Sequence, residues 1–265
     1  MSETLLTLDN VCVELGSGDS AVRPVDGVSL SINRGETYAL LGESGCGTSM
    51  TALSILRLLP QPIGHITSGR VLLGNEELTA LPESEMRRIR GRRISMIFQE
   101  PMTSLNPVLT VGDQIAEVLG QHHGMKGRVA QDRVMELLDA VGIPDARRRL
   151  REYPHQLSGG MKQRVMISIA LAGEPDLLIA DEPTTALDVT IQAQVLELLQ
   201  QLQQDTHMAI LLITHDLGIG AGMADRVAVM YAGQLVEEAS RDRFFGSAAH
   251  PYSQKLFESL PEVRK

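Results

Sequence analysis

The pattern of hydrophobic and polar positions divides the chain into a strand-rich beginning, a helical middle and an alternation of the two afterwards. In the first third, apolar residues alternate loosely or form short runs between glycine-rich turns, which is typical of strands. The expected strands are Leu5–Leu15, Val25–Ile32, Thr37–Leu41, Gly69–Leu73 and Ile94–Phe98. Between the third and fourth of these we expect a helix closed by Pro60 and Pro62, because leucines recur there at helical spacing: Leu53, Leu56 and Leu59.

Apolar residues from about residue 111 to residue 157 follow a helical period instead. Two apolar faces are visible: Ile115, Val118 and Leu119, then Val134, Leu137, Leu138 and Val141. Further strands are expected at Leu177–Ala180, Ile210–Thr214 and Val227–Tyr231. A helix between the first two of these carries the stripe Ile191, Val195, Leu198 and Leu202. Buried strands that alternate with helices predict an α/β fold, with a mainly parallel sheet covered on both faces.

Composition and charge exclude several classes of protein. The 265 residues carry a formal net charge of −9, so we expect no binding to nucleic acid or anionic lipid by charge alone. Two cysteines, Cys12 and Cys46, make neither a disulfide framework nor a metal-binding spacing, which favours a reducing cytoplasm. No signal peptide is visible, and the longest apolar runs are far shorter than the ~20 residues of a membrane-spanning helix.

A glycine-rich segment follows the strand Thr37–Leu41 and precedes the expected helix. It fits the phosphate-loop pattern G-x-x-x-x-G-K-[ST] at every defined position except the lysine. In such a loop the backbone N–H groups wrap a phosphate, and the helix N-terminus adds a favourable field. The segment alone does not exclude an ordinary turn, but with the motifs that follow it we expect Ser49 to bind Mg²⁺ and these residues to bind nucleotide: Gly42, Ser44, Gly45, Cys46, Gly47, Thr48 and Ser49.

Thr48 stands where this loop normally has its lysine. The lysine reaches the β- and γ-phosphates as a point charge, and threonine has neither the reach nor the charge. Loss of one such stabiliser typically costs ~10²–10³ in rate. We therefore expect nucleotide at this loop to be turned over poorly. Two origins stay open: a deliberate inactivating substitution, which the intact remainder of the motif set favours, and a naturally degenerate site.

Two later segments carry candidate chemistry. The strand at 177–180 ends in Asp181 and Glu182, of which the first would hold Mg²⁺ and the second would polarise a water aimed at the γ-phosphate. Taken alone, this pair is nearly as compatible with an acidic strand end of no catalytic role. Ser158, Gly159 and Gly160 open a helix and predict a second anion-binding helix N-terminus, whose chemistry coincides with ordinary helix capping.

The order of these motifs resembles one family over nearly the whole chain. After the phosphate loop come Gln99 in Phe98–Pro101, the Leu157–Gln163 stretch, the Asp181–Glu182 pair, Thr185–Asp188 and Thr214–Asp216. This combination resembles the ATP-binding subunit of an ABC transporter. The resemblance implies a P-loop NTPase core with an N-terminal antiparallel β-subdomain and an inserted helical subdomain, and it implies ATP and Mg²⁺ as cofactors.

The resemblance also implies roles for particular residues. Glu182 would be catalytic, together with His215, which would clamp the γ-phosphate, and Gln99, which would sense Mg²⁺ and water and couple to membrane subunits. The segment 158–160 would reach ATP held by a partner subunit, and Asp188 would communicate across the dimer. The residues implied as ligands of Mg²⁺ are Ser49, Gln99 and Asp181.

The implied partners are a homologous, non-identical ATPase subunit or domain, two polytopic membrane subunits and an extracytoplasmic substrate-binding protein, with no nucleic acid. The chain would lie at the cytoplasmic face of the inner membrane as a peripheral subunit. We expect one ABC ATPase domain over residues 1–265. Its expected parts are a core with the β-subdomain at 1–106 and 166–240, a helical subdomain with the signature motif at 107–165, and a C-terminal segment at 241–265.

Three stretches resemble the peptide and nickel uptake branch of this family: Ile97–Pro107, Tyr153–Gln156 and His250–Leu256. They imply import of peptides, or of nickel or its chelates. No cysteine-bearing extension follows, which leaves an iron–sulfur cluster unsupported, and the ending also resembles the first half of a fused two-ATPase protein. A non-transport ATPase of the same core, and a regulatory nucleotide-binding module permitted by Thr48, stay open as alternatives.

The aromatic residue that this family usually stacks on adenine is missing. No Phe, Tyr or Trp occurs before Tyr38, and Leu15 or Val22 takes the expected place. Apolar contact would then replace stacking and weaken base selectivity by ~1 kcal/mol. Cys46 is expected to be a small loop filler rather than a redox sensor; its place at a helix start, which would lower its pKa, is the argument for the second reading.

Overall fold

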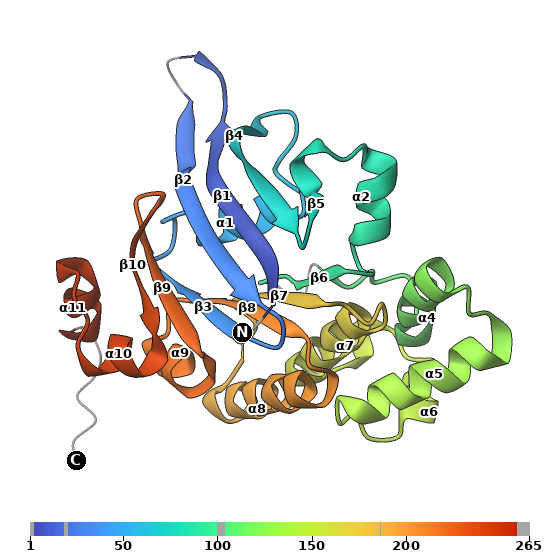
Figure 1. Ribbon diagram of the computed structural model, residues 1–265. Coiled ribbons are helices and arrows are strands. Elements are labelled where there is room, and N and C mark those ends of the chain that lie inside the picture. Colours follow the sequence, from blue (N-terminus) through green and yellow to red (C-terminus); the bar gives the residue numbers. More distant parts are fainter. Residues whose placement is uncertain (1–2, 19–20, 100–103, 186, 259–265) are drawn as a thin grey trace. The chain divides into compact units, whose positions relative to one another are not determined.

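The structure, a computed structural model, describes residues 3–18, 21–99, 104–185 and 187–258 (Figure 1). The chain divides into two compact units. One is made of residues 1–82 together with residues 209–265, and the other is made of residues 83–208.

The first unit contains a four-stranded antiparallel sheet in the order β2-β1-β4-β5. Its strands are β1 (Thr4–Leu15), β2 (Val22–Asn33), β4 (Gly64–Leu73) and β5 (Glu76–Glu77). The N-terminal antiparallel β-subdomain expected from the sequence is thus confirmed. Both β2 and β4 begin earlier than expected, because the pairing with Leu15 of β1 extends to Val22 on one side and to Gly64 on the other.

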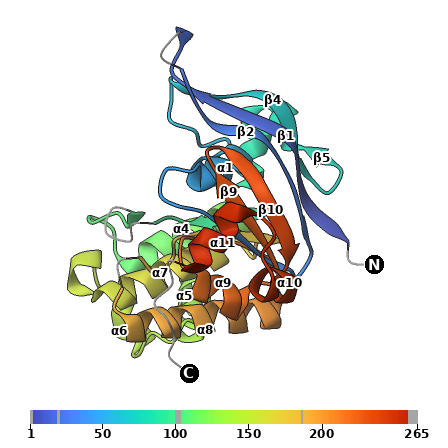
Figure 2. The same cartoon turned by 90° about the vertical axis from the view of Figure 1, so that its left-hand side faces the viewer.

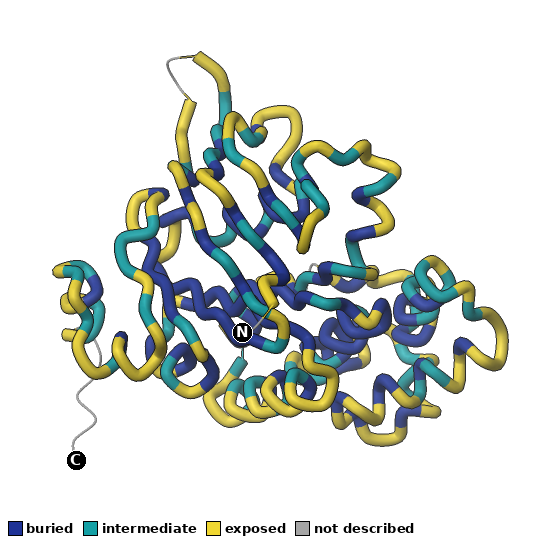
Figure 3. The backbone as a smooth tube through the Cα atoms, viewed as in Figure 1, coloured by how far each residue is buried: buried dark blue, intermediate teal, exposed yellow. Residues whose placement is uncertain are grey.

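The same unit holds a group of mainly parallel strands. There β3 (Thr37–Leu41) lies between β8 (Ala209–Thr214) and β9 (Arg226–Tyr231) and is parallel to both. Every residue of β3 and β8 is buried, which Figure 3 shows in dark blue. Their unbroken apolar runs suit strands that are covered on both faces.

An additional strand, β10 (Gln234–Ser240), pairs antiparallel with β9 at the edge of this group. Its run of mixed polar residues carries little apolar signal, so the pattern of the sequence does not predict this strand. Backbone pairing explains the strand, since an unpaired edge of β9 would leave a row of N–H and C=O groups without partners.

The helices of the first unit are η2 (Leu78–Ala80), α1 (Thr48–Ile55), α9 (Leu217–Met223), α10 (Arg241–Gly246) and α11 (Pro251–Glu258). The expectation that α1 would continue to Pro60 is wrong. The backbone of Arg57 is left-handed, with φ of 52°, and its guanidinium donates to the carbonyl of Leu78 at 3.2 Å. A left-handed residue cannot continue a right-handed helix, so the helix ends before it.

The second unit contains two parallel strands, β6 (Ile94–Ile97) and β7 (Leu177–Asp181), and most of the helices. The helices are α2 (Glu83–Ile89), α4 (Val111–His123), α5 (Gly127–Ala140), α6 (Ala146–Arg149), η3 (Pro154–Gln156), α7 (Gly159–Leu171) and α8 (Val189–Thr206). The apolar faces expected between residues 111 and 157 are largely buried: Ile115, Leu119, Val134, Leu137, Leu138 and Val141. Val118 is only half-buried.

Some expected motif residues lie outside the described part of the chain. These are residues 100–103 of the stretch Ile97–Pro107, Ala186 of the stretch Thr185–Asp188, and residues 259–265 of the C-terminal segment. Among the described residues, no helix is both long enough and apolar enough to cross a membrane.

Candidate functional site

The phosphate loop joins the buried end of β3 to the start of α1. Gly45 and Gly47 have φ of 85° and 111°, a region that residues with a Cβ rarely adopt. Gly47 is also the N-cap of α1, and a Cβ on it would lie 1.9 Å from the carbonyl oxygen of Pro24. Glycine is therefore required at position 47 for two separate reasons. The outer part of the loop, Glu43 to Gly45, is exposed.

Backbone hydrogen bonds hold this loop from both sides. Within the loop, the N–H of Cys46 donates to the carbonyl of Glu43 at 3.1 Å. From the turn between β9 and β10, the N–H of Gly233 donates to the carbonyl of Cys46 at 2.9 Å. The hydroxyl of Thr51 donates to the carbonyl of Gly47 at 3.0 Å. The shape of the loop is thus fixed by hydrogen bonds within the chain, as a preorganised anion site requires.

Thr48 is the first residue of α1 and turns its side chain back toward the loop. Its methyl carbon lies 3.4 Å from the position that a Cβ on Gly42 would take. Its hydroxyl and its backbone N–H both act on the thiol of Cys46 by hydrogen bonding. Thr48, which stands in place of the lysine, therefore interacts with other residues of the loop.

The expectation of a lowered pKa for Cys46 is wrong. The thiol is buried, and burial, the largest effect, raises its pKa above the ordinary value of 9.0. Hydrogen bonds from Thr48 act in the opposite direction but do not prevail. The helix N-terminus stabilises the thiolate, but removal of the thiolate from water destabilises it by more.

We expect Cys46 to react with iodoacetamide more slowly than free cysteine at pH 7, because the reagent attacks the thiolate and the pKa of Cys46 is raised. The rate should continue to increase with pH above 9.0, the ordinary thiol pKa, where an unburied thiol has begun to level off. Mass spectrometry of the Cys12→Ser variant, labelled across this pH range, isolates Cys46. Labelling at pH 7 as fast as free cysteine would contradict the burial argument.

His215 comes to the same sheet edge as the phosphate loop. It follows β8, and Thr214 at the end of β8 lies opposite Leu41 at the end of β3 in the parallel register. His215 is exposed, and the next residue, Asp216, caps α9 by accepting from the N–H of Gly218 at 2.7 Å. The carboxyl ends of parallel strands are where ligands bind in α/β proteins. Two candidate elements far apart in sequence thus share one edge.

Gln99 and Glu182 are in direct contact in the second unit. The side-chain amide of Gln99 donates to Oε2 of Glu182 at 2.9 Å, and the hydroxyl of Thr185 donates to the same oxygen at 2.6 Å. The parallel register that places Ile97 opposite Ala180 brings the two strand ends together. Sequence reasoning missed Thr185 as a functional candidate; the signal was a hydroxyl three residues after the glutamate.

The backbone at Glu182 is left-handed, with φ of 46°. A residue with a side chain adopts this conformation at an energetic cost, and such positions are concentrated at functional sites. The residue before it, Asp181, is 5% exposed at the end of β7. The two adjacent carboxylates thus occupy different environments, one buried and one half-buried.

The signature segment begins α7 and lies against the start of α8. Ser158 is the N-cap of α7 and accepts from the N–H of Met161 at 3.4 Å. Asp188 is the N-cap of α8 and accepts from the N–H of Ile191 at 3.0 Å. A Cβ on Gly160 would lie 2.8 Å from the side chain of Ile191, so these two helix starts are packed together. Ser158, Gly159 and Asp188 remain exposed.

The expected site residues thus fall into two groups. The phosphate loop and His215 belong to the first unit. Gln99, Asp181 and Glu182 belong to the second, together with Ser158–Gly160 and Asp188. In the first unit the loop and His215 share one sheet edge; in the second, Gln99 contacts Glu182, and Gly160 packs at the start of α8, which Asp188 caps.

The expected place of the missing aromatic is the far end of the β1–β2 pair. Leu15 and Val22 are partners in the antiparallel register, so both expected positions form one cross-strand pair. Val22 is 62% exposed and Leu15 is half-buried. An apolar surface is thus present there, without an aromatic ring.

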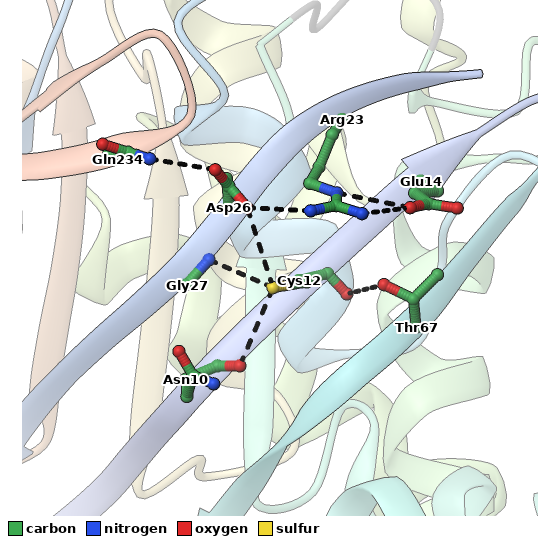
Figure 4. A network of polar contacts seen from close by, with 8 residues as sticks. All are labelled: Asn10, Cys12, Glu14, Arg23, Asp26, Gly27, Thr67 and Gln234. Carbon is green, nitrogen blue, oxygen red and sulfur yellow. Dashed lines mark hydrogen bonds and ion pairs between the residues drawn. The ribbon is translucent and has the colours of Figure 1, made fainter. Parts of the chain in front are cut away.

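A polar network surrounds the strands next to this pair (Figure 4). The Arg23 guanidinium contacts Glu14 at 2.6 Å and Asp26 at 3.3 Å. The side-chain amide of Gln234, in β10, donates to Asp26 at 2.9 Å, and this bond is the largest cause of the lowered pKa of Asp26. Cys12 accepts from the N–H of Gly27 at 3.2 Å. Because exposed ion pairs contribute little stability, this network serves chiefly to orient the strands.

The ABC transporter family model matches residues 25–185. The dipeptide transport ATP-binding protein DppD of Bacillus subtilis is 52% identical over 261 residues, which are 98% of this chain and 78% of that protein. The oligopeptide transport ATP-binding protein AppD of the same organism is 54% identical over 260 residues, which are 98% of this chain and 79% of that protein. A putative peptide import ATP-binding protein of Brucella ovis is 54% identical over 244 residues, covering 90% and 72% of the two chains.

Solved structures give the same result. A dimeric post-hydrolysis state of the ATP-binding cassette MJ0796, bound to ADP and Pi, matches with a TM-score of 0.80 and 29% identity. The match covers 89% of this chain and 99% of that chain. The expected P-loop NTPase fold is thereby confirmed.

Proposed function

This chain belongs to the ABC transporter family, and from that premise we propose that it is the ATP-binding and ATP-hydrolysing subunit of a peptide importer. One observation carries the proposal: identities of 52% and 54% over 98% of the chain to proteins named for dipeptide and oligopeptide transport. The branch resemblance makes nickel or its chelates the second choice of cargo.

The phosphate loop would hold the triphosphate of ATP. The backbone N–H groups of residues 44–49 and the start of α1 supply donors and a positive field without a lysine. The fixed loop shape and the requirement for glycine at position 47 support this role. Because Thr48 is turned toward Cys46, binding would depend on the backbone, and little charge would be offered to the transition state.

Mg²⁺ fits the donor set proposed for it. Ser49, Gln99 and Asp181 offer a hydroxyl, an amide and a carboxylate oxygen, which are the hard ligands that Mg²⁺ prefers together with phosphate and water. Asp181, at the end of β7, directly precedes Glu182, the residue proposed to polarise the attacking water. When bound, the ion would neutralise part of the phosphate charge.

Glu182 would be the group that polarises the attacking water. Gln99 and Thr185 both donate to its Oε2, so side chains of this chain orient the carboxylate. His215, exposed at the edge where the phosphate loop begins, would contact the γ-phosphate. These roles follow the chemistry of positioned general bases and charge-stabilising donors.

A second ATPase subunit would complete the site. Ser158, Gly159 and Asp188 are exposed at the adjoining starts of α7 and α8, where they are available to nucleotide held by a partner. The matched cassette MJ0796 is dimeric. With a non-identical partner that carries the lysine, the site using this chain's Ser158 would stay active, and the site using Thr48 would be impaired.

The remaining partners would be two polytopic membrane subunits and, through them, an extracytoplasmic binding protein. The chain would lie at the cytoplasmic face of the inner membrane. We divide it by role into a nucleotide-binding core with the β-subdomain at 1–106 and 166–240, a helical subdomain at 107–165 and a C-terminal segment at 241–265. Closure on ATP and reopening after cleavage would drive transport.

Reconstitution tests the proposed function. The complex with its membrane subunits, partner ATPase and binding protein is placed in vesicles, and uptake of a radiolabelled dipeptide is measured with and without ATP. We expect uptake that requires both ATP and this chain. Nucleotide binding without turnover or uptake would instead favour a regulatory module, which Thr48 supports as the alternative. Uptake of nickel but not of peptide would show that the cargo is nickel and not peptide.

We expect this chain to bind ATP and GTP with dissociation constants that differ by less than tenfold, because an apolar pair stands where the stacking ring is missing. Placing a ring there with Leu15→Tyr is expected to tighten ATP binding by about fivefold, since an aromatic contact is worth ~1 kcal/mol. Calorimetric titration of both nucleotides measures this. Discrimination of tenfold or more by the unaltered chain would show that another group selects the base.

A further inference from the structure

The C-terminal helix α11 lies beside β9 and β10 in the first unit (Figure 2). Tyr252 of α11 packs against Tyr231, the last residue of β9, with ring centroids 4.5 Å apart. Tyr252 also packs on the apolar cluster that includes Leu41, the last residue of β3. The ring therefore packs on the last residue of β9 and on a cluster that includes the last residue of β3.

Met230 and Gly233, one residue before and two residues after Tyr231, lie against the loop. The carbonyl oxygen of Met230 lies 2.8 Å from the position that a Cβ on Gly42 would take. The N–H of Gly233 donates to the carbonyl of Cys46 at 2.9 Å. A displacement of Tyr231 would therefore be transmitted to both ends of the segment 42–46.

The hydroxyl of Tyr252 faces the same loop. Its oxygen is buried and makes no hydrogen bond of ordinary geometry within the described residues. Burial raises the pKa of Tyr252, and the charge of Glu43 raises it further. The nearby backbone N–H of Glu43 has the opposite effect and lowers this pKa. Glu43 is the first residue of the loop after Gly42 and directly precedes Ser44, the first of the proposed backbone donors to phosphate.

The start of α11 is held firmly enough to act as a support. The carboxylate of Glu237, in β10, accepts from the N–H of Ala249 at 2.7 Å and from the N–H of His250 at 3.0 Å. Nδ1 of His250 in turn accepts from the N–H of Tyr252 at 3.2 Å. These bonds fix the backbone of Tyr252 relative to β10.

We propose that Tyr252 is a positioning residue for the phosphate loop: its ring, held by α11 against Tyr231, keeps Glu43 and the segment 42–46 in the shape that binds phosphate. The inference rests on the nucleotide binding proposed above for this loop. Its ring acts through Tyr231, whose neighbours Met230 and Gly233 lie against the loop. Removal of the support would lower affinity, because the loop would then have to be ordered on binding.

Hydrogen exchange of the full chain without nucleotide tests the positioning directly. Tyr252→Ala is expected to speed amide exchange at residues 43–47 by about fivefold, the equivalent of one lost aromatic contact. Phe257→Ala is the matched control, because Phe257 lies on the same helix and packs on Phe244 and Phe245, with ring centroids 5.2 and 5.6 Å apart. It is expected to leave exchange at 43–47 unchanged.

Nucleotide affinity gives the second measurement. In the Thr48→Lys protein, Tyr252→Ala is expected to weaken MgATP binding about fivefold, Tyr252→Phe to retain it and Phe257→Ala to change it less than twofold. Should Tyr252→Ala fail to fold, Tyr252→Leu takes its place in both measurements.

The outcomes separate the two proposals. Unchanged exchange at 43–47 in a folded Tyr252→Ala or Tyr252→Leu protein overturns the positioning role, whatever the nucleotide affinity. Faster exchange at 43–47 in a protein that binds no nucleotide, even with Thr48→Lys, supports the positioning role and overturns the proposed function of the loop. Equal effects of Tyr252→Ala and Phe257→Ala on the loop would mean that Tyr252 contributes only general packing. That result would also overturn the positioning role.

Discussion

Thr48→Lys is expected to raise the ATPase rate of the assembled dimer by ~10²–10³, which is the usual effect of one preorganised charge on a transition state. The lysine would direct its ammonium at the β- and γ-phosphates, whereas the present threonine is engaged with the thiol of Cys46. The measurement is phosphate release at saturating MgATP, with the complex and its membrane subunits at fixed concentration.

Thr48→Met is the matched control, because methionine has nearly the length of lysine but no charge. It is expected to leave the rate within about threefold of the unaltered chain, since only the charge acts on the transition state. An equal gain in both variants would mean that side-chain length, or loss of the contact with Cys46, is responsible. No gain from Thr48→Lys would show that this loop supports turnover without the lysine, or that it takes no part in turnover.

Glu182→Gln in the Thr48→Lys protein is expected to lower the ATPase rate by ~10²–10⁴, the contribution of a positioned general base. Glutamine keeps an oxygen that accepts from Gln99 and Thr185 but cannot take a proton from water. Nucleotide binding should therefore persist while turnover is lost. Single-turnover kinetics and equilibrium binding on the same preparation distinguish the two.

Thr185→Val provides the comparison for that experiment. It removes one of the two donors to Oε2 of Glu182 but keeps the carboxylate, so a smaller loss, on the order of tenfold, is expected from poorer orientation. If Glu182→Gln retained a rate within tenfold of its parent, some other group would have to polarise the water. If Thr185→Val were as damaging as Glu182→Gln, orientation would outweigh proton transfer.

Local sequence patterns predicted much of the fold. The buried strands at 37–41, 177–180 and 210–214 are recognisable because unbroken apolar runs bounded by polar residues need no distant partner to be identified. Elements whose stability comes from neighbours were not predicted. β10 is polar and exists by pairing with β9, and α11 depends on the cluster around Phe244.

The candidate chemistry was also readable from the chain, but its geometry was not. Gln99 and Glu182 are 83 positions apart, and only the register of β6 with β7 puts the amide 2.9 Å from the carboxylate. The raised pKa of Cys46 depends on burial by the surrounding fold, which a position at a helix start does not reveal.

The sequence by itself determined which chemical groups this protein has and in what order, because the glycine-rich loop, the paired carboxylates and the two helix caps are each encoded within a few consecutive residues. Only the tertiary structure decided which residues meet: Thr214 opposite Leu41, Thr185 on Glu182, Tyr252 against Tyr231. The reason is that strand register and side-chain burial depend on partners distant in the chain, whose combined packing no short stretch of residues encodes.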